Sequence, residues 1–144
     1  MQIRRMVLED CEQVAAIEAV SFSVPWSQGA FVATVSHPGY RYFVAEENGE
    51  ILGYCGFTYV LDEAEIPNVC VSAKVRGCGI GKKMMLALFE EAKSLGVATL
   101  YLEVRQSNMP AQKLYRSVGF EEIGLRKNFY EQPKEDALLM KRTL

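Results

Sequence analysis

The residues with the clearest chemical content lie between Asn68 and Glu91. A short apolar run, Val69-Cys70-Val71, precedes a glycine-rich loop at residues 76–81, and apolar residues then recur at helical spacing. This order predicts a strand, a loop and a helix. The first N–H groups of a helix have no intrahelical partner and lie at the positive end of its dipole. Because glycine lets an anion approach the backbone closely, the segment predicts a phosphate-binding site.

Three kinds of phosphate-binding loop can be compared with this segment. A P-loop needs Gly-Lys-Ser/Thr, but Lys82 is followed by Lys83 and supplies no hydroxyl for magnesium. The dinucleotide pattern G-x-G-x-x-G is not completed, although Glu103 lies at a distance suited to an acidic ribose ligand, so this alternative stays open. The third pattern, Arg-x-x-Gly-x-Gly, is met by Arg76, Gly79 and Gly81. A merely tight turn does not need three alternating glycines.

The third pattern resembles the pyrophosphate loop of the GCN5-related N-acetyltransferases, which bind acetyl-CoA. Further stretches resemble the branch of that family that acetylates the N-terminal alanine of ribosomal protein S18. They are Pro25-Trp26-Ser27, Leu102-Glu103-Val104-Arg105 with Ser107-Asn108, Leu114-Tyr115 with Gly119-Phe120, and residues 135–140. The resemblance covers nearly the whole chain. One departure is Ser72-Ala73, which stands where the family often has an acidic residue and a proline.

The resemblance implies roles for particular residues. Glu103 would be the general base and Tyr115 the general acid, while Trp26 and Tyr130 would contact the acceptor, which the resemblance implies is the S18 N-terminus or a similar protein terminus. No metal is implied. The residues implied to hold acetyl-CoA through the strand, the loop and the next helix are Val69, Cys70, Val71, Arg76, Gly77, Cys78, Gly79, Ile80, Gly81, Lys82 and Asn108.

The chemistry of acyl transfer to an amine agrees with these residue types. The amine must be neutral, and an α-amino group has a pKa of roughly 7.7–8.0 against ~10.4 for lysine. An N-terminal amine is therefore the easier substrate for a carboxylate base. A glutamate of ordinary pKa, ~4.3, is a poor base unless burial raises its pKa or a water molecule relays the proton.

Each of these roles has an alternative. Glu103 can be a solvent-facing strand residue, Tyr115 a core residue of a helix, and Trp26 a packing residue rather than part of an acceptor site. The protein can also be a CoA-binding module without turnover, or an acetyltransferase for a small amine. The sequence does not decide among these alternatives, and it does not indicate an oligomeric state.

The remaining pattern predicts an α/β fold with a mixed, mostly antiparallel sheet of about six or seven strands flanked by helices. Asn48-Gly49 predicts a hairpin turn, and Pro67 predicts a splayed strand end because proline cannot donate a ladder hydrogen bond. Residues 62–65 read as an acidic loop that is either solvated or attracts a cationic acceptor. The first helix is expected to bury an apolar stripe of Cys11, Val14, Ala15, Ile17 and Ala19.

Composition limits the class of protein. A length of 144 residues predicts one domain over 1–144, and a net charge of −2 argues against nucleic-acid binding. Four cysteines show neither a C-x-x-C pair nor zinc spacing, which predicts free thiols in a reducing compartment. No signal peptide or membrane-spanning run is visible, so we expect a cytoplasmic protein without a membrane partner. The only histidine, His37, lies in a predicted turn and is expected to face solvent.

Overall fold

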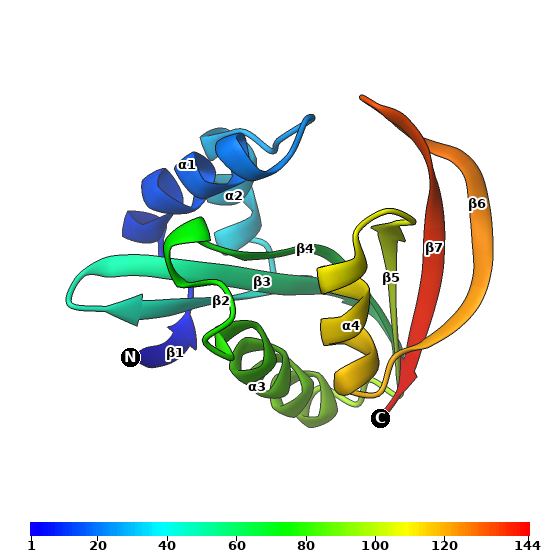
Figure 1. The fold of residues 1–144 in the computed structure, drawn as a ribbon. Helices are drawn as coiled ribbons and strands as arrows, with labels where there is room; N and C mark the ends of the chain where they lie inside the picture. The colour runs from blue at the N-terminus through cyan, green and yellow to red at the C-terminus, as the bar shows by residue number, and fades with distance from the viewer.

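A computed structural model describes residues 1–144 as a seven-stranded sheet with helices on both faces (Figure 1). The strand order is β1-β2-β3-β4-β5-β7-β6, and every neighbouring pair is antiparallel except β4 and β5. The expected mixed, mostly antiparallel sheet is confirmed. The strands are β1 (Gln2–Arg5), β2 (Tyr40–Glu47), β3 (Glu50–Val60), β4 (Glu63–Val71), β5 (Thr99–Arg105), β6 (Glu121–Glu131) and β7 (Lys134–Thr143).

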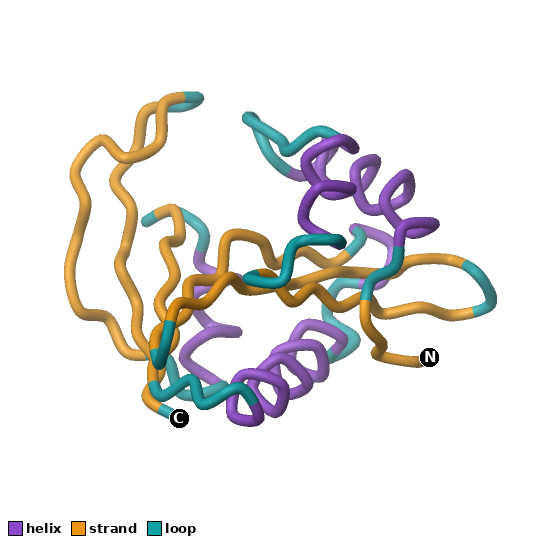
Figure 2. The backbone as a smooth tube through the Cα atoms, turned by 180° about the vertical axis from the view of Figure 1, so that it is seen from behind, coloured by secondary structure: helices purple, strands orange, loops and turns teal.

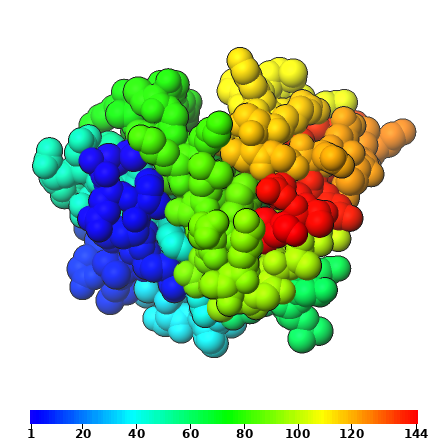
Figure 3. Space-filling model, turned by 90° about the horizontal axis from the view of Figure 1, so that it is seen from below, coloured from blue at the N-terminus to red at the C-terminus, as the bar shows by residue number.

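The helices are divided between the two faces of the sheet (Figure 1, Figure 2). On one face, α1 (Cys11–Ser21) and α2 (Gln28–Val35) cover β2 and β3, and a 3-10 turn, η1 (Leu8–Asp10), precedes α1. On the other face lie α3 (Ile80–Ser94) and α4 (Met109–Ser117), with a second 3-10 turn, η2 (Ala73–Val75), before the glycine loop. Seen from below, α3 lies between the N-terminal segment and the C-terminal end (Figure 3).

The two faces bury separate hydrophobic cores. The larger core joins α3 and α4 to the sheet and includes Met84, Leu88, Leu100 and Met140. The smaller core joins α1 and α2 to β2 and β3. The sheet therefore holds two helical layers apart, and residues on the two faces of one strand serve different cores.

The β2–β3 hairpin forms as the sequence predicted. Asn48 and Gly49 both have positive φ values, 51° and 82°, which match a two-residue turn with the twist of the flanking strands. Glycine is also required at Gly56, because a Cβ there would overlap the buried ring of Tyr42. Gly56 thus lets β3 pass close to the Tyr42 ring of β2.

Near Pro67 the pairing of β4 with its neighbouring strands changes. The face of the sheet toward which its side chains point changes there as well. Against β3, Thr58 pairs with Glu65 but Gly56 pairs with Asn68, so β4 carries an extra residue, a β-bulge. Against β5, only residues 63–65 of β4 are paired. Ala64 and Ile66 therefore join the core under α3 and α4, whereas Asn68 points to the opposite face beside α1. The expected splayed strand end near Pro67 is confirmed.

Two expectations from the sequence are wrong. In α1 the buried residue near the helix end is Glu18, whereas Ala19 is exposed. The acidic loop is shorter than expected, because Glu63 already belongs to β4 and only Leu61 and Asp62 form the turn.

All four cysteines are free thiols, as the sequence predicted, and only Cys78 is exposed. None of the helices combines the length and apolar character needed to cross a membrane.

The contact between Gly56 and Tyr42 gives a test of the packing. Gly56→Ala should destabilise the fold by about 1–3 kcal/mol, because the new methyl group overlaps a ring that the core holds in place. Gly124→Ala is the matched control, since Gly124 is also a strand glycine but has no neighbouring atom within 4 Å of the added Cβ. Urea denaturation measures both. Equal stability losses for the two variants would contradict this account of Gly56.

Candidate active site

The central feature of the candidate site is the gap between β4 and β5. Beyond Glu65, the β5-facing edge of β4 has no partner strand, while β5 continues to pair with β7 on its other side. The unpaired stretch of β4 contains Val69, Cys70 and Val71, the strand residues that the sequence singled out. Unpaired backbone groups at this edge can bond to an extended ligand placed between the strands.

The glycine loop has the geometry expected of an anion-binding turn. Gly77 and Gly79 have φ values of 84° and 80°, a region that favours glycine, and nothing lies within 4 Å of a Cβ built on either residue. Helix α3 begins directly afterwards at Ile80, so the first-turn N–H groups lack intrahelical partners. Arg76 Nε donates to the Val71 carbonyl at 3.1 Å, which ties the loop to the end of β4.

Helix α4 and the start of α3 meet at Gly81. A Cβ on Gly81 would lie 3.0 Å from Leu114 Cδ2 and 3.6 Å from Val71 Cγ2, so glycine allows α3, α4 and β4 to converge. The Asn108 side chain accepts a hydrogen bond from the Ala111 N–H at 3.2 Å and caps α4. The start of α3, the end of β4 and α4 therefore lie close together at Gly81.

Glu103 lies on the opposite face of β5 from the core under α3 and α4. Tyr101, Glu103 and Arg105 share this face, which we call the acceptor face. The Glu103 side chain is 34% exposed, and its Oε1 lies 3.8 Å from Arg126 Nη1. Burial raises the pKa of Glu103 above its ordinary value, Glu65 adds to the rise, and Arg126 opposes it. A carboxylate with a raised pKa is a better proton acceptor at neutral pH.

Tyr115 comes from the other side of the sheet. It lies on α4, is only 7% exposed, and belongs to the larger core. Burial is the main cause that raises its pKa, and the nearby ionisable groups of Tyr130, Cys55 and Cys70 add to the rise. These neighbours belong to β6, β3 and β4, which are strands on both sides of the gap between β4 and β5. The phenol stays protonated at neutral pH and can donate a proton.

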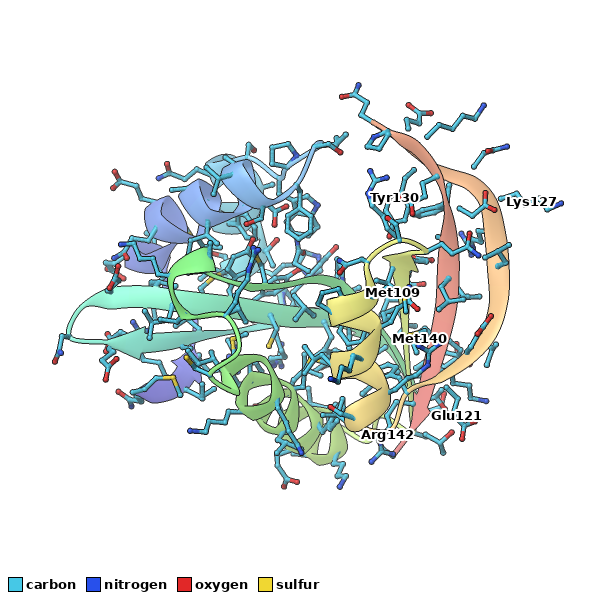
Figure 4. The ribbon with its side chains drawn as sticks, viewed as in Figure 1. Met109, Glu121, Lys127, Tyr130, Met140 and Arg142 are labelled. Carbon is cyan, nitrogen blue, oxygen red and sulfur yellow. The ribbon has the colours of Figure 1, made fainter.

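Tyr130 and Trp26, the two residues expected to contact the acceptor, have different surroundings. Tyr130 lies on the inner side of the β6–β7 hairpin, turned toward α1 and α2 (Figure 4). Its ring lies under the guanidinium of Arg105, 4.3 Å from the ring centroid, and burial raises the pKa of Tyr130 to about 12. Trp26 instead packs against Phe31 and Tyr42, with ring centroids 5.3 and 6.2 Å away. Trp26 is thus an aromatic packing residue, and its contact with an acceptor stays a prediction.

A hollow of about 490 Å³ adjoins the acceptor face beside the β3–β4 hairpin. Its lining includes the acidic residues Asp62, Glu63 and Glu65, together with Tyr101 of β5. Glu65 also contributes to the raised pKa of Glu103, so the hollow and Glu103 are electrostatic neighbours. The charge of the hollow suits a cationic ligand.

Sequence reasoning missed a buried polar cluster centred on Glu18, which is 2% exposed. One carboxylate oxygen accepts from the Tyr54 hydroxyl at 2.7 Å, and the other accepts from the Trp26 N–H at 2.9 Å. Asn68 Nδ2 donates to both oxygens at 3.3 Å, and Asn68 Oδ1 accepts from the Tyr42 hydroxyl. The cluster joins the α1–α2 loop to the β4 bulge. A glutamate on the apolar stripe of α1 was the available signal.

Comparison with known proteins agrees with this geometry. Residues 11–120 match the Acetyltransferase (GNAT) family. The chain belongs to this family. It is 37% identical over 143 residues to the [ribosomal protein bS18]-alanine N-acetyltransferase of Haemophilus ducreyi, covering 96% of this chain and 97% of that relative.

Solved structures give the same result. The ribosomal-protein-S18-alanine N-acetyltransferase from Escherichia coli superimposes with a TM-score of 0.89 and 33% identity, covering 99% of this chain and 92% of that chain. An aminoglycoside 6′-N-acetyltransferase complexed with coenzyme A has a TM-score of 0.86 at 17% identity, covering 99% and 97%, which shows a shared fold alone. The family uses acetyl-CoA as its acetyl donor, so this protein is an N-acetyltransferase.

The surroundings of Glu103 give a test of the site electrostatics. Removing the opposing charge in Arg126→Ala should raise the pKa of Glu103 further, because only burial and Glu65 then act on it. Carbon-detected NMR titration of the Glu103 carboxyl measures this pKa. The difference should shrink in 1 M salt, where the screening length is about 3 Å.

Lys93→Ala is the matched control for this titration. It removes the same unit of charge from the end of α3, where Lys93 pairs with Glu90, and should leave the pKa of Glu103 unchanged. A pKa of Glu103 that is lower in Arg126→Ala, or that moves equally in both variants, would show that the ion pair with Arg126 does not set it.

Proposed function

We propose that this N-acetyltransferase acts on the α-amine of a protein N-terminus, with the N-terminal alanine of ribosomal protein S18 as its acceptor. The observation that carries the proposal is the placement of Glu103 and Tyr115 on opposite faces of the sheet around the gap between β4 and β5. Full-length similarity to bS18-alanine N-acetyltransferases supports the choice of acceptor.

In this proposal acetyl-CoA lies in the gap between the strands. The pyrophosphate binds the loop from Arg76 to Lys82, where positive-φ glycines and first-turn N–H groups are accessible. Val69, Cys70 and Val71 offer backbone groups to the pantetheine and acetyl portions, and Asn108 lies near the cofactor at the start of α4. Cys78 and Ile80 contribute as members of the loop, not through reactive side chains.

The proposed reaction is a direct attack of the amine on the thioester. The neutral α-amine forms a bond to the acetyl carbon, and its proton passes to Glu103, directly or through a water molecule. Unpaired N–H groups of β4 stabilise the negative charge on the acetyl oxygen. The carbon–sulfur bond then breaks, and Tyr115 donates its phenolic proton to the departing thiolate. After product release Glu103 gives its proton to solvent, and solvent returns a proton to Tyr115.

The surroundings of Glu103 favour an α-amine over a lysine side chain. At neutral pH an α-amine of pKa ~8 is far more often neutral than a lysine of pKa ~10.4, and the difference amounts to roughly 3 kcal/mol. Burial improves Glu103 as a base without making it a strong one. The acidic hollow beside Tyr101 suits basic residues that follow the terminus. Because the acceptor is a ribosomal protein, we place the reaction in the cytoplasm.

The donor site is tested by a pair of glycine substitutions. Gly79→Val should weaken acetyl-CoA binding at least tenfold, about 1.4 kcal/mol, because a side chain enters the space taken by the pyrophosphate. Gly96→Val is the control, since Gly96 has the same φ of 80° and equally open surroundings but lies at the other end of α3. Both variants should lose similar stability from the left-handed backbone. Calorimetry that shows equal affinities in the two folded variants would overturn the loop assignment.

The acceptor is tested with two peptides. One begins with a free alanine and carries the S18 sequence; the other is N-terminally blocked and contains an internal lysine. The free-amine peptide should be the better substrate by more than tenfold in kcat/KM, which corresponds to about 1.4 kcal/mol. Thiol release measures both rates, and Glu103→Gln supplies the low-activity control.

Three results would count against the proposed function. Preferential acetylation of the blocked peptide would contradict α-amine selectivity. Faster turnover of a panel of small amines than of either peptide would favour a small-molecule acceptor. Tight acetyl-CoA binding without turnover of any amine would indicate a binding module instead of an enzyme.

A further inference from the structure

Arg105 joins segments of the acceptor face that are far apart in the sequence. It is the last residue of β5, two positions after Glu103, and its side chain is 24% exposed. Nη1 donates to the Pro133 carbonyl at 2.8 Å, while Nη2 donates to the Gln132 carbonyl at 3.2 Å and to Ser23 Oγ at 3.3 Å. One guanidinium thus bonds both to the turn between β6 and β7 and to the loop between α1 and α2.

The same guanidinium also holds two side chains. It stacks on Tyr130, 4.3 Å from the ring centroid, and Nη1 lies 3.3 Å from Glu135 Oε1. The other oxygen of Glu135 accepts from the Ser107 N–H at 2.6 Å, in the turn before α4. Bonds from Ser107 and Arg105 hold the pKa of Glu135 below its ordinary value, so this carboxylate stays charged. The contacts therefore extend from the α1–α2 loop to the start of α4.

Arg105 links the α1–α2 loop to the tip of the β6–β7 hairpin. The α1–α2 loop and the tip of the β6–β7 hairpin are separate projections of the ribbon that face each other (Figure 1). The Glu18 cluster holds the α1–α2 loop at Trp26, three residues beyond Ser23. At Ser23 the loop contacts Arg105, and through Arg105 it is joined to the hairpin. A guanidinium can make these bonds together because it presents five donors in one plane; a lysine cannot.

We propose that Arg105 is a positioning residue that sets the separation of these two loops and the orientation of Tyr130, and thereby the binding of the acceptor. The role rests on the proposed function in one respect, that the acceptor reaches Glu103 from the acceptor face. The donor site lies on the other side of β5, and the bonds of the Arg105 guanidinium go to the α1–α2 loop, the hairpin turn and Glu135 rather than to the gap or the glycine loop. Loss of Arg105 therefore affects the acceptor and spares acetyl-CoA.

The test compares Arg105→Ala with Arg142→Ala. Arg142 is a matched control because it also donates to a backbone carbonyl, that of Val118 at 3.0 Å, and lies over an aromatic ring, Phe89 at 5.3 Å. It lies at the opposite end of β7 from Tyr130 (Figure 4). Arg105→Ala should raise the KM for the alanine peptide at least fivefold, with kcat within threefold and the acetyl-CoA Kd within twofold of the parent protein. Arg142→Ala should leave this KM within twofold.

Hydrogen exchange supplies a readout that does not depend on turnover. In Arg105→Ala, amides of residues 20–27 and 129–135 should exchange faster, whereas those of α3 should not change. Ser23→Ala removes only one contact and should speed exchange in the α1–α2 loop alone. Arg105→Lys keeps the charge but not the planar set of donors, so its peptide KM should stay at least threefold above that of the parent protein.

Several results would overturn the proposal. An unchanged peptide KM with unchanged exchange in folded Arg105→Ala would do so, as would full recovery in Arg105→Lys or an equal KM effect in Arg142→Ala. If the parent protein acetylates no peptide, the proposed function fails by itself, and the exchange experiment still decides whether Arg105 holds the loops. If Arg105→Ala does not fold, Arg105→Lys and Ser23→Ala carry the same tests.

Discussion

The separation of β4 from β5 is the constraint on which the rest of the structure depends. A parallel pair that continued past Glu65 would satisfy its own backbone groups and leave no edge for a ligand. Pro67 has no N–H to donate, and the bulge around it adds a residue to β4. The pairing with β5 ends at Glu65, ahead of Pro67 and of the apolar run Val69-Cys70-Val71. The gap also divides the sheet, so that α3 and α4 meet on one side while the acceptor face opens on the other.

The bulge has a second consequence, because it directs Asn68 toward α1. There Asn68 meets Glu18, whose buried carboxylate has no lysine or arginine partner but accepts from a hydroxyl, a backbone N–H and an amide. A carboxylate removed from water is costly unless its oxygens are fully bonded, so each donor of this cluster is held firmly in place. The same cluster holds Trp26 near the end of the α1–α2 loop, and Arg105 contacts that loop nearer its start, at Ser23. The α1–α2 loop is thus held at both Trp26 and Ser23.

The two candidate proton-transfer groups differ in how their surroundings act on them. Glu103 is only partly exposed, and burial together with Glu65 raises its pKa while Arg126 limits the rise. Tyr115 is almost fully buried among apolar residues, which keeps its phenol protonated. The sheet lies between the two side chains, so Glu103 and Tyr115 have different surroundings. Burial is the main cause that raises the pKa of each candidate group, one a carboxylate and the other a phenol.

The sequence by itself determined the features that depend on local rules. The Asn48-Gly49 turn, the Asn108 cap, the alternation in β5 and the glycine loop before α3 follow from φ preferences, capping and periodicity, which act over a few residues. The broken pairing at Pro67 could also be predicted, because a missing N–H is a property of one residue. The tertiary structure alone decided that Glu18 is buried and Ala19 exposed, since helical spacing allows either and only Tyr54, Trp26 and Asn68 together make burial of a carboxylate favourable. It also decided the contacts of Arg105, because Ser23 and Gln132 are brought to β5 from distant parts of the chain by packing, for which no local pattern exists.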